Sequence, residues 1–252
     1  MKTVSVALLP SLIDQDYLPG SFAIVIDVLR ATSVIATALA GGARRIVTCN
    51  SIDEAHSLKQ SLDPGALLCG ERGGLPIPGF DLSNSPTEYT PDIVSGKTLV
   101  LTTTNGTKAL AALDAADTVV TASFLNVSAV LAEAIKSERV LVVCAGTNGQ
   151  ITGEDVLLAG AITKELTQQS TFEPANDQAH LARSHWQQSV GDLQNFEELT
   201  AALHQTLGGR NLKKIGFDDD VPRVAKVDTH NVVPIRTSQA PIEIGLARKT
   251  ST

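Results

Sequence analysis

Short apolar segments rich in β-branched residues alternate with alanine-rich segments through the first two-thirds of the chain, and this alternation restricts the possible folds. Several apolar segments lack polar alternation, as expected for strands that are buried on both faces. The predicted strands cover residues 3–9, 22–29, 45–49, 66–70, 98–104, 118–123 and 139–146. The predicted helices cover residues 32–43, 51–62, 106–116, 126–137 and 153–168. Repeated strand–helix alternation predicts an α/β fold with a mostly parallel sheet flanked by helices.

The composition changes near residue 170, where Gln, Asn, His and Glu become frequent. The sequence of this part predicts two further helices, a short helix and a final strand. We therefore expect an α/β core over residues 1–169 that carries most of the site loops. Residues 170–252 are expected to form a C-terminal helical extension and a closing strand. No low-complexity linker separates the two parts, so we expect them to pack as one unit.

Charge and hydropathy argue against several classes of function. The formal net charge is −7 and the sequence has no basic stripe with interleaved aromatic residues, so no nucleic-acid partner is indicated. No apolar run approaches the roughly 20 residues that span a bilayer, and the first residues do not resemble an export signal. We therefore expect a cytoplasmic protein without a membrane partner, and a homo-oligomer is left open. Three cysteines without C-x-x-C spacing favour neither a disulfide framework nor a zinc ribbon.

Polar side chains collect where the predicted strands end. Ligands of open α/β sheets bind outside the carboxyl ends of the strands, so these exits form the candidate site. The exit residues are Asp27, Arg30, Thr32 and Ser33; Glu71 and Arg72; Thr103, Thr104, Asn105, Gly106 and Thr107; Ser123 and Asn126; and Glu154 and Asp155.

Each exit also has a purely structural explanation. Ser, Thr, Asn and Asp are common helix caps, and acids such as Glu154 and Asp155 suit a helix N-terminus without any ligand. Asp27 and Arg30 also fit a local ion pair. The coincidence of five polar exits favours a ligand site. Acids beside arginines indicate a hard cation and an oxyanion, because Mg²⁺ is commonly held by one or two carboxylates, waters and phosphate oxygens.

A long irregular segment, GERGGLPIPGFDLSNSPTEY at residues 70–89, follows the fourth predicted strand. Irregular loops longer than roughly 12–15 residues are uncommon in compact domains and are usually functional or disordered. Phe80, Leu82, Pro86 and Tyr89 provide apolar anchors, so we expect an ordered loop that contributes to the site.

The common signatures of phosphate chemistry are absent from the sequence. No stretch supplies the G-x-x-x-x-G-K-[ST] pattern of a P-loop. The sixth residue after Cys144 is Gln150, whereas cysteine-dependent phosphatases have arginine there. Asp27 is followed two residues later by Leu29, so the paired aspartates of the haloacid-dehalogenase type are also missing at this exit.

Five blocks in a fixed order nevertheless carry a resemblance to a known family. They are VIDVLRATSVIATALAGGA, GERGGLPIPGFDLSNSPTEY, TTTNGTKAL, ASFLNVSAV and VCAGTNGQITGEDVLLAG, followed by a further match in GRNLKKIGFDDDVPRVAKVDTHNVVP. Together they resemble the 2-phosphosulfolactate phosphatase family, also called the ComB family. The resemblance covers most of the chain and is weak over residues 171–207.

This resemblance implies an α/β fold outside the common phosphatase classes. It also implies Mg²⁺-dependent hydrolysis of a phosphomonoester, 2-phospho-3-sulfolactate, to 3-sulfolactate and phosphate, a step of coenzyme M biosynthesis. Two alternatives stay open: an enzyme acting on another phosphorylated hydroxy acid or sugar phosphate, and a non-catalytic protein that binds an anionic metabolite. To the exit residues the resemblance adds Asp81, Asn84, Ser85, Cys144 and Gly146.

A phosphate monoester resists hydrolysis because its dianion repels an attacking group, so catalysis needs charge neutralisation and a positioned nucleophile. We expect Mg²⁺ at two or three of the acids Asp27, Asp81, Glu154 and Asp155. The nucleophile stays open between a water, which we favour, Asp27 and Cys144.

The remaining residues are assigned to the substrate. Arg30 and Arg72 are expected to bind its phosphate, carboxylate or sulfonate, and Glu71 is expected to act as general acid. The other expected substrate-binding residues are Thr32, Ser33, Asn84, Ser85, Thr103, Asn105, Gly106, Thr107, Ser123, Asn126 and Gly146.

Overall fold

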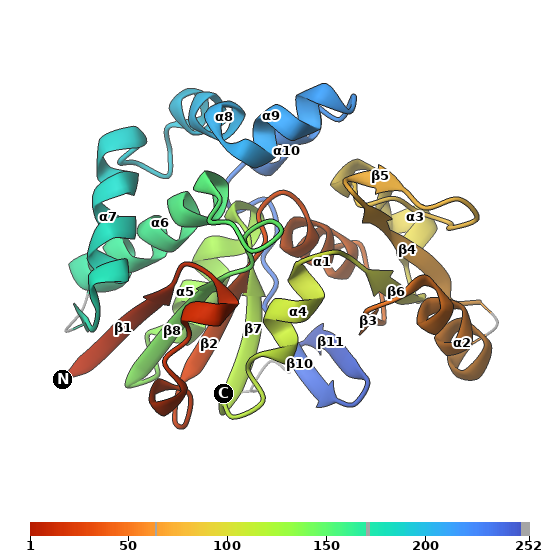
Figure 1. Cartoon of the computed structure of the whole chain (residues 1–252), viewed down its shortest axis with the longest axis horizontal. Coiled ribbons are helices and arrows are strands. Elements are labelled where there is room, and N and C mark those ends of the chain that lie inside the picture. Colours follow the sequence, from red (N-terminus) through yellow and green to blue (C-terminus); the bar gives the residue numbers. More distant parts are fainter. Residues whose placement is uncertain (64, 170–171, 248–252) are drawn as a thin grey trace.

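The computed structural model describes residues 1–63, 65–169 and 172–247 of the 252-residue chain. Its strands form a single sheet in the order β5-β4-β6-β3-β11-β10-β7-β2-β8-β1-β9, with helices packed against it (Figure 1). The sheet consists of two parallel blocks joined by an antiparallel hairpin. The α/β fold class and the mostly parallel sheet predicted from the sequence are therefore confirmed.

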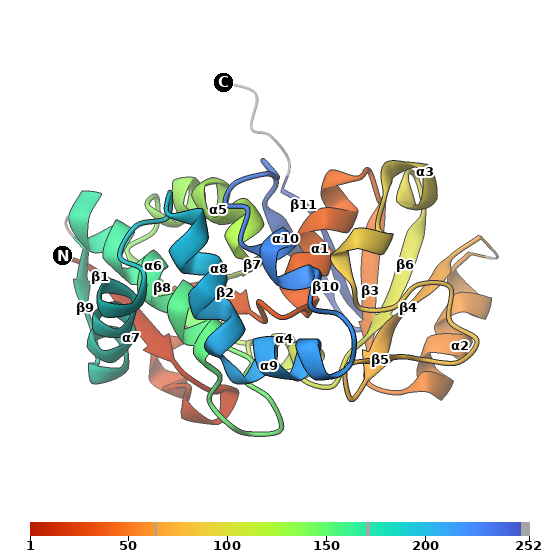
Figure 2. The same ribbon diagram turned by 90° about the horizontal axis from the view of Figure 1, so that it is seen from above.

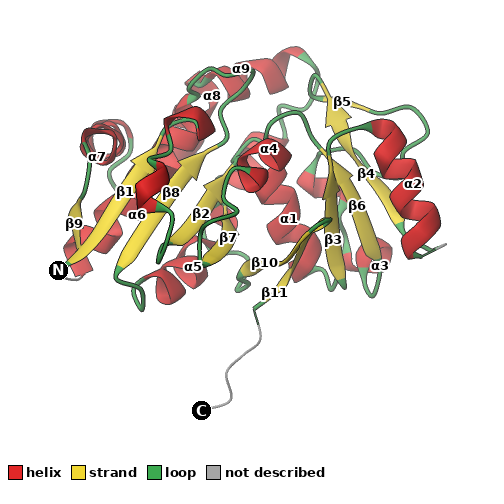
Figure 3. Ribbon diagram, turned by 60° about the horizontal axis from the view of Figure 1, so that its bottom comes forward, coloured by secondary structure: helices red, strands yellow, loops and turns green. Residues whose placement is uncertain are grey.

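The first parallel block contains β1 (Lys2–Ala7), β2 (Phe22–Ile26), β7 (Thr118–Ala122), β8 (Arg139–Cys144) and β9 (Phe172–Pro174). In the second block, β3 (Arg45–Cys49), β4 (Leu67–Arg72) and β6 (Thr98–Thr102) are parallel, and the short β5 (Leu75–Pro76) lies antiparallel at the edge. The hairpin of β10 (Pro234–Gln239) and β11 (Ile242–Leu246) joins β7 to β3 (Figure 3).

The helices are α1 (Ala31–Ala40), α2 (Ile52–Leu62), α3 (Pro91–Val94), α4 (Gly106–Ala111) and α5 (Val127–Ala134), followed by α6 (Gly153–Gln169), α7 (Asp177–Ser189), α8 (Phe196–Gln205), α9 (Leu207–Lys214) and α10 (Asp220–Val224). Seen from above, α9 and α10 lie between the first block and the second (Figure 2). None of the described helices is both long and apolar enough to cross a membrane.

Strand β2 shows why the sequence has continuous apolar runs. Ile24 and Ile26 belong to a core on one face of the sheet with residues of α5 to α9, whereas Ala23 and Val25 belong to a core on the other face. The second core also contains residues of α1, α4, β3 and β6, so it joins the two blocks. Burial of alternate side chains on both faces requires apolar residues at every position of the strand.

The register aligns the ends of neighbouring strands. Ile26 lies opposite Ala122 of β7 and Cys144 of β8, and in the second block Thr102 of β6 lies opposite Cys49 and Gly70. Gly70 is required there, because a Cβ at this position would collide with the Thr102 carbonyl oxygen. The polar residues that follow these strands therefore start from two aligned rows of strand ends.

The closing segment differs from the expected single strand. It is a hairpin in the middle of the sheet, and residues 172–174 add a further short strand at the sheet edge. The division at residue 170 stays a prediction, although strands from both sides of it share the same sheet. The sequence does not reveal these strands because they contain polar residues and form only by pairing with strands that are distant in the sequence.

Candidate active site

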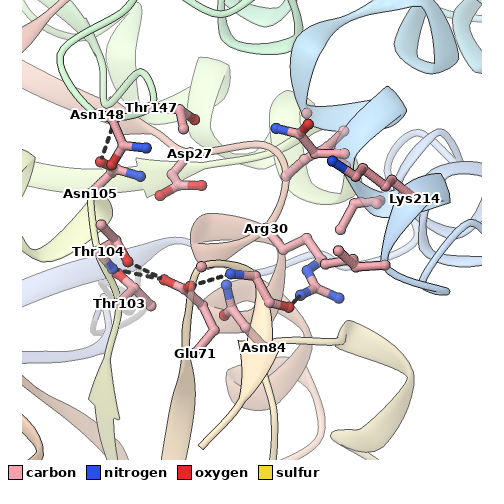
Figure 4. A pocket seen from close by; sticks show the side chains of 17 residues that line it. Asp27, Arg30, Glu71, Asn84, Thr103, Thr104, Asn105, Thr147, Asn148 and Lys214 are labelled. Atoms are coloured by element: carbon pink, nitrogen blue, oxygen red, sulfur yellow. Dashed lines mark hydrogen bonds between the residues drawn. The ribbon is translucent and has the colours of Figure 1, made fainter.

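A cavity of about 340 Å³ opens where strand exits from both blocks meet (Figure 4). Four of the five predicted polar exits reach it, those after β2, β4, β6 and β8. The remaining wall comes from α9 and the residue after it. Its polar lining includes Asp27, Arg30, Glu71, Asn84, Thr103, Thr104, Asn105, Thr147, Asn148, Asn211 and Lys214. A hydrogen bond from the Asn148 backbone N–H to Asn105 Oδ1 (3.1 Å) connects the two blocks at the rim.

Asp27 is the first residue after β2, and local hydrogen bonds fix its position. Its Oδ1 accepts a hydrogen bond from the Ala31 N–H at 3.2 Å, at the start of α1. Thr32 Oγ1 accepts from the Asp27 N–H and donates to the Asp27 carbonyl. Both contacts are within the protein and give no support to the predicted role of Thr32 in substrate binding. A Cβ on Gly106 would lie 3.0 Å from Asp27 Oδ2, so the glycine leaves room for this carboxylate.

Asp27 lines the cavity, and two further acids, Glu154 and Asp155, lie buried behind it. Burial, together with the negative charges of Glu71 and Glu154, raises the pKa of Asp27 to about 7 against the opposing effects of the Ala31 N–H and Arg30. Burial and repulsion from Asp27 and Glu154 also hold the pKa of Asp155 well above its usual range. Such a concentration of negative charge is unfavourable without a cation and marks functional sites more often than structural ones.

Asp155 and Glu154 have backbone partners. Asp155 accepts hydrogen bonds from the backbone N–H groups of Val28 (2.9 Å) and Gly146 (3.0 Å), one on each carboxylate oxygen. Glu154 Oε2 accepts from the Gly208 N–H of α9 at 3.3 Å. Both acids are 2% exposed, so they brace the loops around Asp27 from behind the cavity.

Glu71 ties three segments together. Its Oε1 accepts from the Thr104 N–H (2.8 Å) and the Thr104 hydroxyl (2.9 Å), and its Oε2 accepts from the Gly74 N–H (2.7 Å). These contacts hold the exit of β6 and the turn after β4 against the cavity. They support a positioning role for Glu71, whereas its expected role as general acid stays a prediction.

Arg30 forms an ion pair with Asp220 rather than with Asp27. Its Nη1 lies 2.6 Å from Asp220 Oδ2, both side chains are almost fully buried, and Nη2 donates to the Gly74 carbonyl at 2.8 Å. The Phe217 ring lies 4.5 Å from the guanidinium carbon. Since Asp220 also accepts from Ser85 Oγ at 2.6 Å, this network joins the exit of β2, the long loop and α10.

Two buried polar atoms in the cavity wall have no hydrogen-bond partner among the described residues. They are Asn84 Oδ1 and Thr103 Oγ1, and each side chain is 4% exposed. An unpaired buried polar group costs about 1–3 kcal/mol, so a wall with two of them suits a polar ligand. Among the predicted substrate-binding residues, these two have the strongest support from the geometry.

The long loop of residues 70–89 is ordered as expected. It contains β5 and a short 3-10 turn (Pro86–Glu88), and Leu82 and Tyr89 are buried in the core. The Tyr89 hydroxyl donates to the Ser83 carbonyl at 2.6 Å. The first three residues of this segment belong to β4 rather than to the loop, and the segment supplies Glu71 and Asn84 to the cavity wall.

Several predicted site residues lie outside the cavity lining. Asp81 pairs with Lys59 at 3.0 Å, and Arg72 donates to backbone carbonyls and to the Thr102 hydroxyl. Ser85, Ser33 and Thr107 are buried and hydrogen-bonded within the protein. The structure therefore does not bring these side chains to the cavity, because each already serves a local contact.

The exit of β7 is likewise turned away. Ser123 and Asn126 form a capping box, and Asn126 Nδ2 donates to the Val232 carbonyl before the hairpin. Gly146 offers its N–H to Asp155. Cys144 is fully buried beside Ile26, and burial with the nearby charges of Asp155 and Glu154 raises the pKa of its thiol well above the usual range. This placement gives no support to a thiolate nucleophile.

The sequence reasoning missed the contribution of α9 and α10. Lys214 and Asn211 line the cavity, and Asp220 holds Arg30, yet none of them was singled out. The matching block GRNLKKIGFDDDVP was the available signal, because it belongs to the same ordered pattern as the strand exits. Thr147 and Asn148, in a TNG turn that repeats the one at residues 104–106, also line the cavity.

The acidic side chains around the cavity can be related to the ligands that Mg²⁺ prefers. Across residues 1–63, 65–169 and 172–247, no group of three or more His, Cys, Asp or Glu side chains is arranged to hold a metal ion. Mg²⁺ does not require such a cage, because it keeps several waters and takes substrate phosphate oxygens besides one or two carboxylates. Asp27 fits that pattern, since it lines the cavity and lies within a surplus of negative charge.

Comparison with known proteins assigns the family. The profile of the 2-phosphosulpholactate phosphatase family matches residues 7–239. The chain belongs to this family. Its members similar to this chain include the probable 2-phosphosulfolactate phosphatases of Caldanaerobacter subterraneus subsp. tengcongensis, 38% identical over 86% of this chain and 90% of the relative, and of Thermotoga maritima, 40% identical over 84% and 87%.

A third relative, the probable 2-phosphosulfolactate phosphatase of Carboxydothermus hydrogenoformans, is 42% identical over 84% of each chain. The matched range of the 2-phosphosulfolactate phosphatase family includes every residue that lines the cavity. The resemblance noted in the sequence is thus confirmed at the level of the family.

Proposed function

We propose that the chain is a phosphoric monoester hydrolase that converts 2-phospho-3-sulfolactate to 3-sulfolactate and phosphate with Mg²⁺. The observation that carries the proposal is the meeting of four strand exits at one cavity around Asp27. The names of its relatives agree with the reaction. The proposed Mg²⁺ dependence is supported by the acidity of the site, whereas the proposed link to coenzyme M biosynthesis rests on the family resemblance alone.

Asp27 is the residue that we assign to the metal. Its Oδ1 is held by the Ala31 N–H, and its Oδ2 has no hydrogen-bond partner in the described part of the chain. Glu154 and Asp155 already accept backbone hydrogen bonds, so we assign them to shaping the site and to favouring a cation by their charge. Mg²⁺ held at Asp27 would offset the negative charge of the phosphate and activate an attacking water.

The residues of the chain then orient the substrate. Asn84 and Thr103 have free hydrogen-bonding atoms in the wall, and we assign them to the oxygens of the phosphate group. Glu71 holds Thr104 and Gly74, and we assign it to fixing the exit of β6 and the turn after β4 in the cavity wall. A fixed wall of this kind lowers the barrier because the polar groups need no rearrangement as charge develops.

The test uses the purified full-length chain, stripped with a chelator and then supplied with Mg²⁺. We expect release of inorganic phosphate from 2-phospho-3-sulfolactate, little release without Mg²⁺, and none above background from the Asp27→Asn variant. Turnover that persists in chelator would contradict the metal assignment. Comparable turnover of glycerol 2-phosphate and sugar phosphates would instead contradict the narrow substrate assignment.

Cytoplasmic location and the absence of a nucleic-acid partner stay predictions from composition. The oligomeric state stays open.

A further inference from the structure

The cavity wall carries two cationic side chains, and only one of them is neutralised. Arg30 and Lys214 are the Lys and Arg residues that line it in the described part of the chain. Arg30 is 2% exposed and its charge is matched by Asp220 at 2.6 Å. No described side chain forms an ion pair or hydrogen bond with Lys214, which is exposed. Lys214 is therefore the cation still available to an anionic ligand.

The position of Lys214 is set by contacts at both ends of α9. Thr206 caps the helix by accepting from the Gly209 N–H at 3.1 Å, and Glu154 accepts from Gly208. Beyond the helix, Phe217 stacks on Arg30. In Figure 4, Lys214 lies across the cavity from Asn105 and Asn148. The ammonium group is thus carried by a helix that is anchored to the same network as the cavity floor.

The charges of the proposed substrate require a cation on the α9 side of the cavity. It carries a carboxylate and a sulfonate besides its phosphate, while Asp27 and Glu71 add negative charge to the wall. Mg²⁺ at Asp27 would serve the phosphate, and the charge of Arg30 is already matched. A non-reacting anion would remain without a positive partner unless Lys214 supplies one, since an ammonium group binds oxyanions as a point charge.

We propose that Lys214 binds the non-reacting anionic end of the substrate, a sulfonate or carboxylate oxygen, and thereby selects phosphomonoesters that carry a second anion. This inference rests on the proposed function and assigns a specificity role to α9. The alternative explanation, that Lys214 only complements the C-terminal dipole of α9, applies equally to its neighbour Lys213, which does not line the cavity. Lys213 therefore provides the matched control.

The kinetic test compares wild type, Lys214→Gln, Lys214→Arg and Lys213→Gln on three substrates. These are 2-phospho-3-sulfolactate, 2-phospholactate, which lacks the sulfonate, and 2-phosphooxyethanesulfonate, which lacks the carboxylate. We expect Lys214→Gln to raise KM for the full substrate about tenfold with kcat little changed, because a contact made equally in ground and transition states affects binding alone. Lys214→Arg and Lys213→Gln should stay within about threefold of wild type.

The analogues identify the anion. The one that lacks the group bound by Lys214 should show the same KM for wild type and Lys214→Gln. If Lys214→Gln behaves like Lys213→Gln on all three substrates, or Lys214→Arg loses as much as Lys214→Gln, the inference is wrong.

A binding measurement separates this inference from the proposed function. Calorimetry with 3-sulfolactate, which carries both non-reacting anions, should give a Kd about tenfold weaker for Lys214→Gln than for Lys213→Gln. Equal Kd values would refute the role of Lys214 even if wild type hydrolyses the phosphate ester. If wild type releases no phosphate from any of the esters, the proposed function fails, and the calorimetric comparison still decides whether Lys214 binds the anion.

Discussion

Replacing Asp27 with asparagine should stabilise the metal-free protein while removing its activity. Asparagine has nearly the same shape and keeps an oxygen for the Ala31 N–H, which donates to Asp27 Oδ1 at 3.2 Å. What it removes is a negative charge that burial, Glu71 and Glu154 make unfavourable. Many active-site substitutions would remove activity. A gain in stability is expected here because the substitution also removes an unfavourable charge.

The magnitude follows from the pKa of Asp27, raised from 3.8 to about 7 in the folded protein. At about 1.4 kcal/mol per pKa unit this corresponds to a ceiling of about 4 kcal/mol, which we reduce to about 2 kcal/mol because the side chain is only half-buried. Below pH 4 the carboxyl is protonated in both states and has no effect. From about pH 4 to 7 the unfolded state releases the proton while the folded state retains it, so wild type loses stability that the variant keeps, and above pH 7 the difference levels off.

The assay is urea unfolding in chelator at several pH values from 5 to 8, with the exposed Asp92→Asn as control. The advantage of Asp27→Asn should increase over this range and reach about 2 kcal/mol at pH 8. Addition of Mg²⁺ should then stabilise wild type and not the variant, because a ligand stabilises only the state that binds it. A variant less stable than wild type at pH 8, or a difference independent of pH, would show that the Asp27 carboxylate does not destabilise the folded protein.

Three further predictions concern the surroundings of the cavity. Asp220→Ala leaves Arg30 buried without a counter-charge and should lower the free energy of unfolding by about 3–5 kcal/mol in urea; a loss under about 1 kcal/mol would contradict the importance of the pair. Asn84→Leu removes an unpaired buried amide oxygen and should raise stability by about 1 kcal/mol while lowering kcat/KM at least tenfold; unchanged kcat/KM would argue against substrate contact. Cys144→Ala should keep kcat within about twofold despite a stability cost of about 1 kcal/mol, whereas complete loss of turnover in a folded variant would revive the thiolate route.

The strands of the parallel blocks could be predicted because burial on both faces leaves a continuous apolar run. Residues 45–49 form β3 with the predicted bounds, and the runs after Phe22 and Arg139 end two or three residues earlier than predicted. The hairpin and β9 could not be placed in the same way. Their segments are short and partly polar, and only pairing with distant strands fixes them.

The candidate site was predictable to the extent that strand exits decide it. Asp27 and Asn105 follow strands whose ends the register aligns, Glu71 lies at the end of β4, and all three reach the cavity. The partner of Arg30 was not predictable from local sequence, because Asp220 lies 190 residues further along the chain. Cys144 matched the pattern but is the last residue of β8, where its side chain faces the core instead of the cavity.

Release of inorganic phosphate decides whether the cavity around Asp27 is a catalytic site. Wild type and Asp27→Asn should be assayed side by side on 2-phospho-3-sulfolactate with and without Mg²⁺, after circular dichroism has shown that both are folded. We expect Mg²⁺-dependent release of inorganic phosphate by wild type and none above background by the variant. Equal release by the two folded proteins would contradict a catalytic site at Asp27.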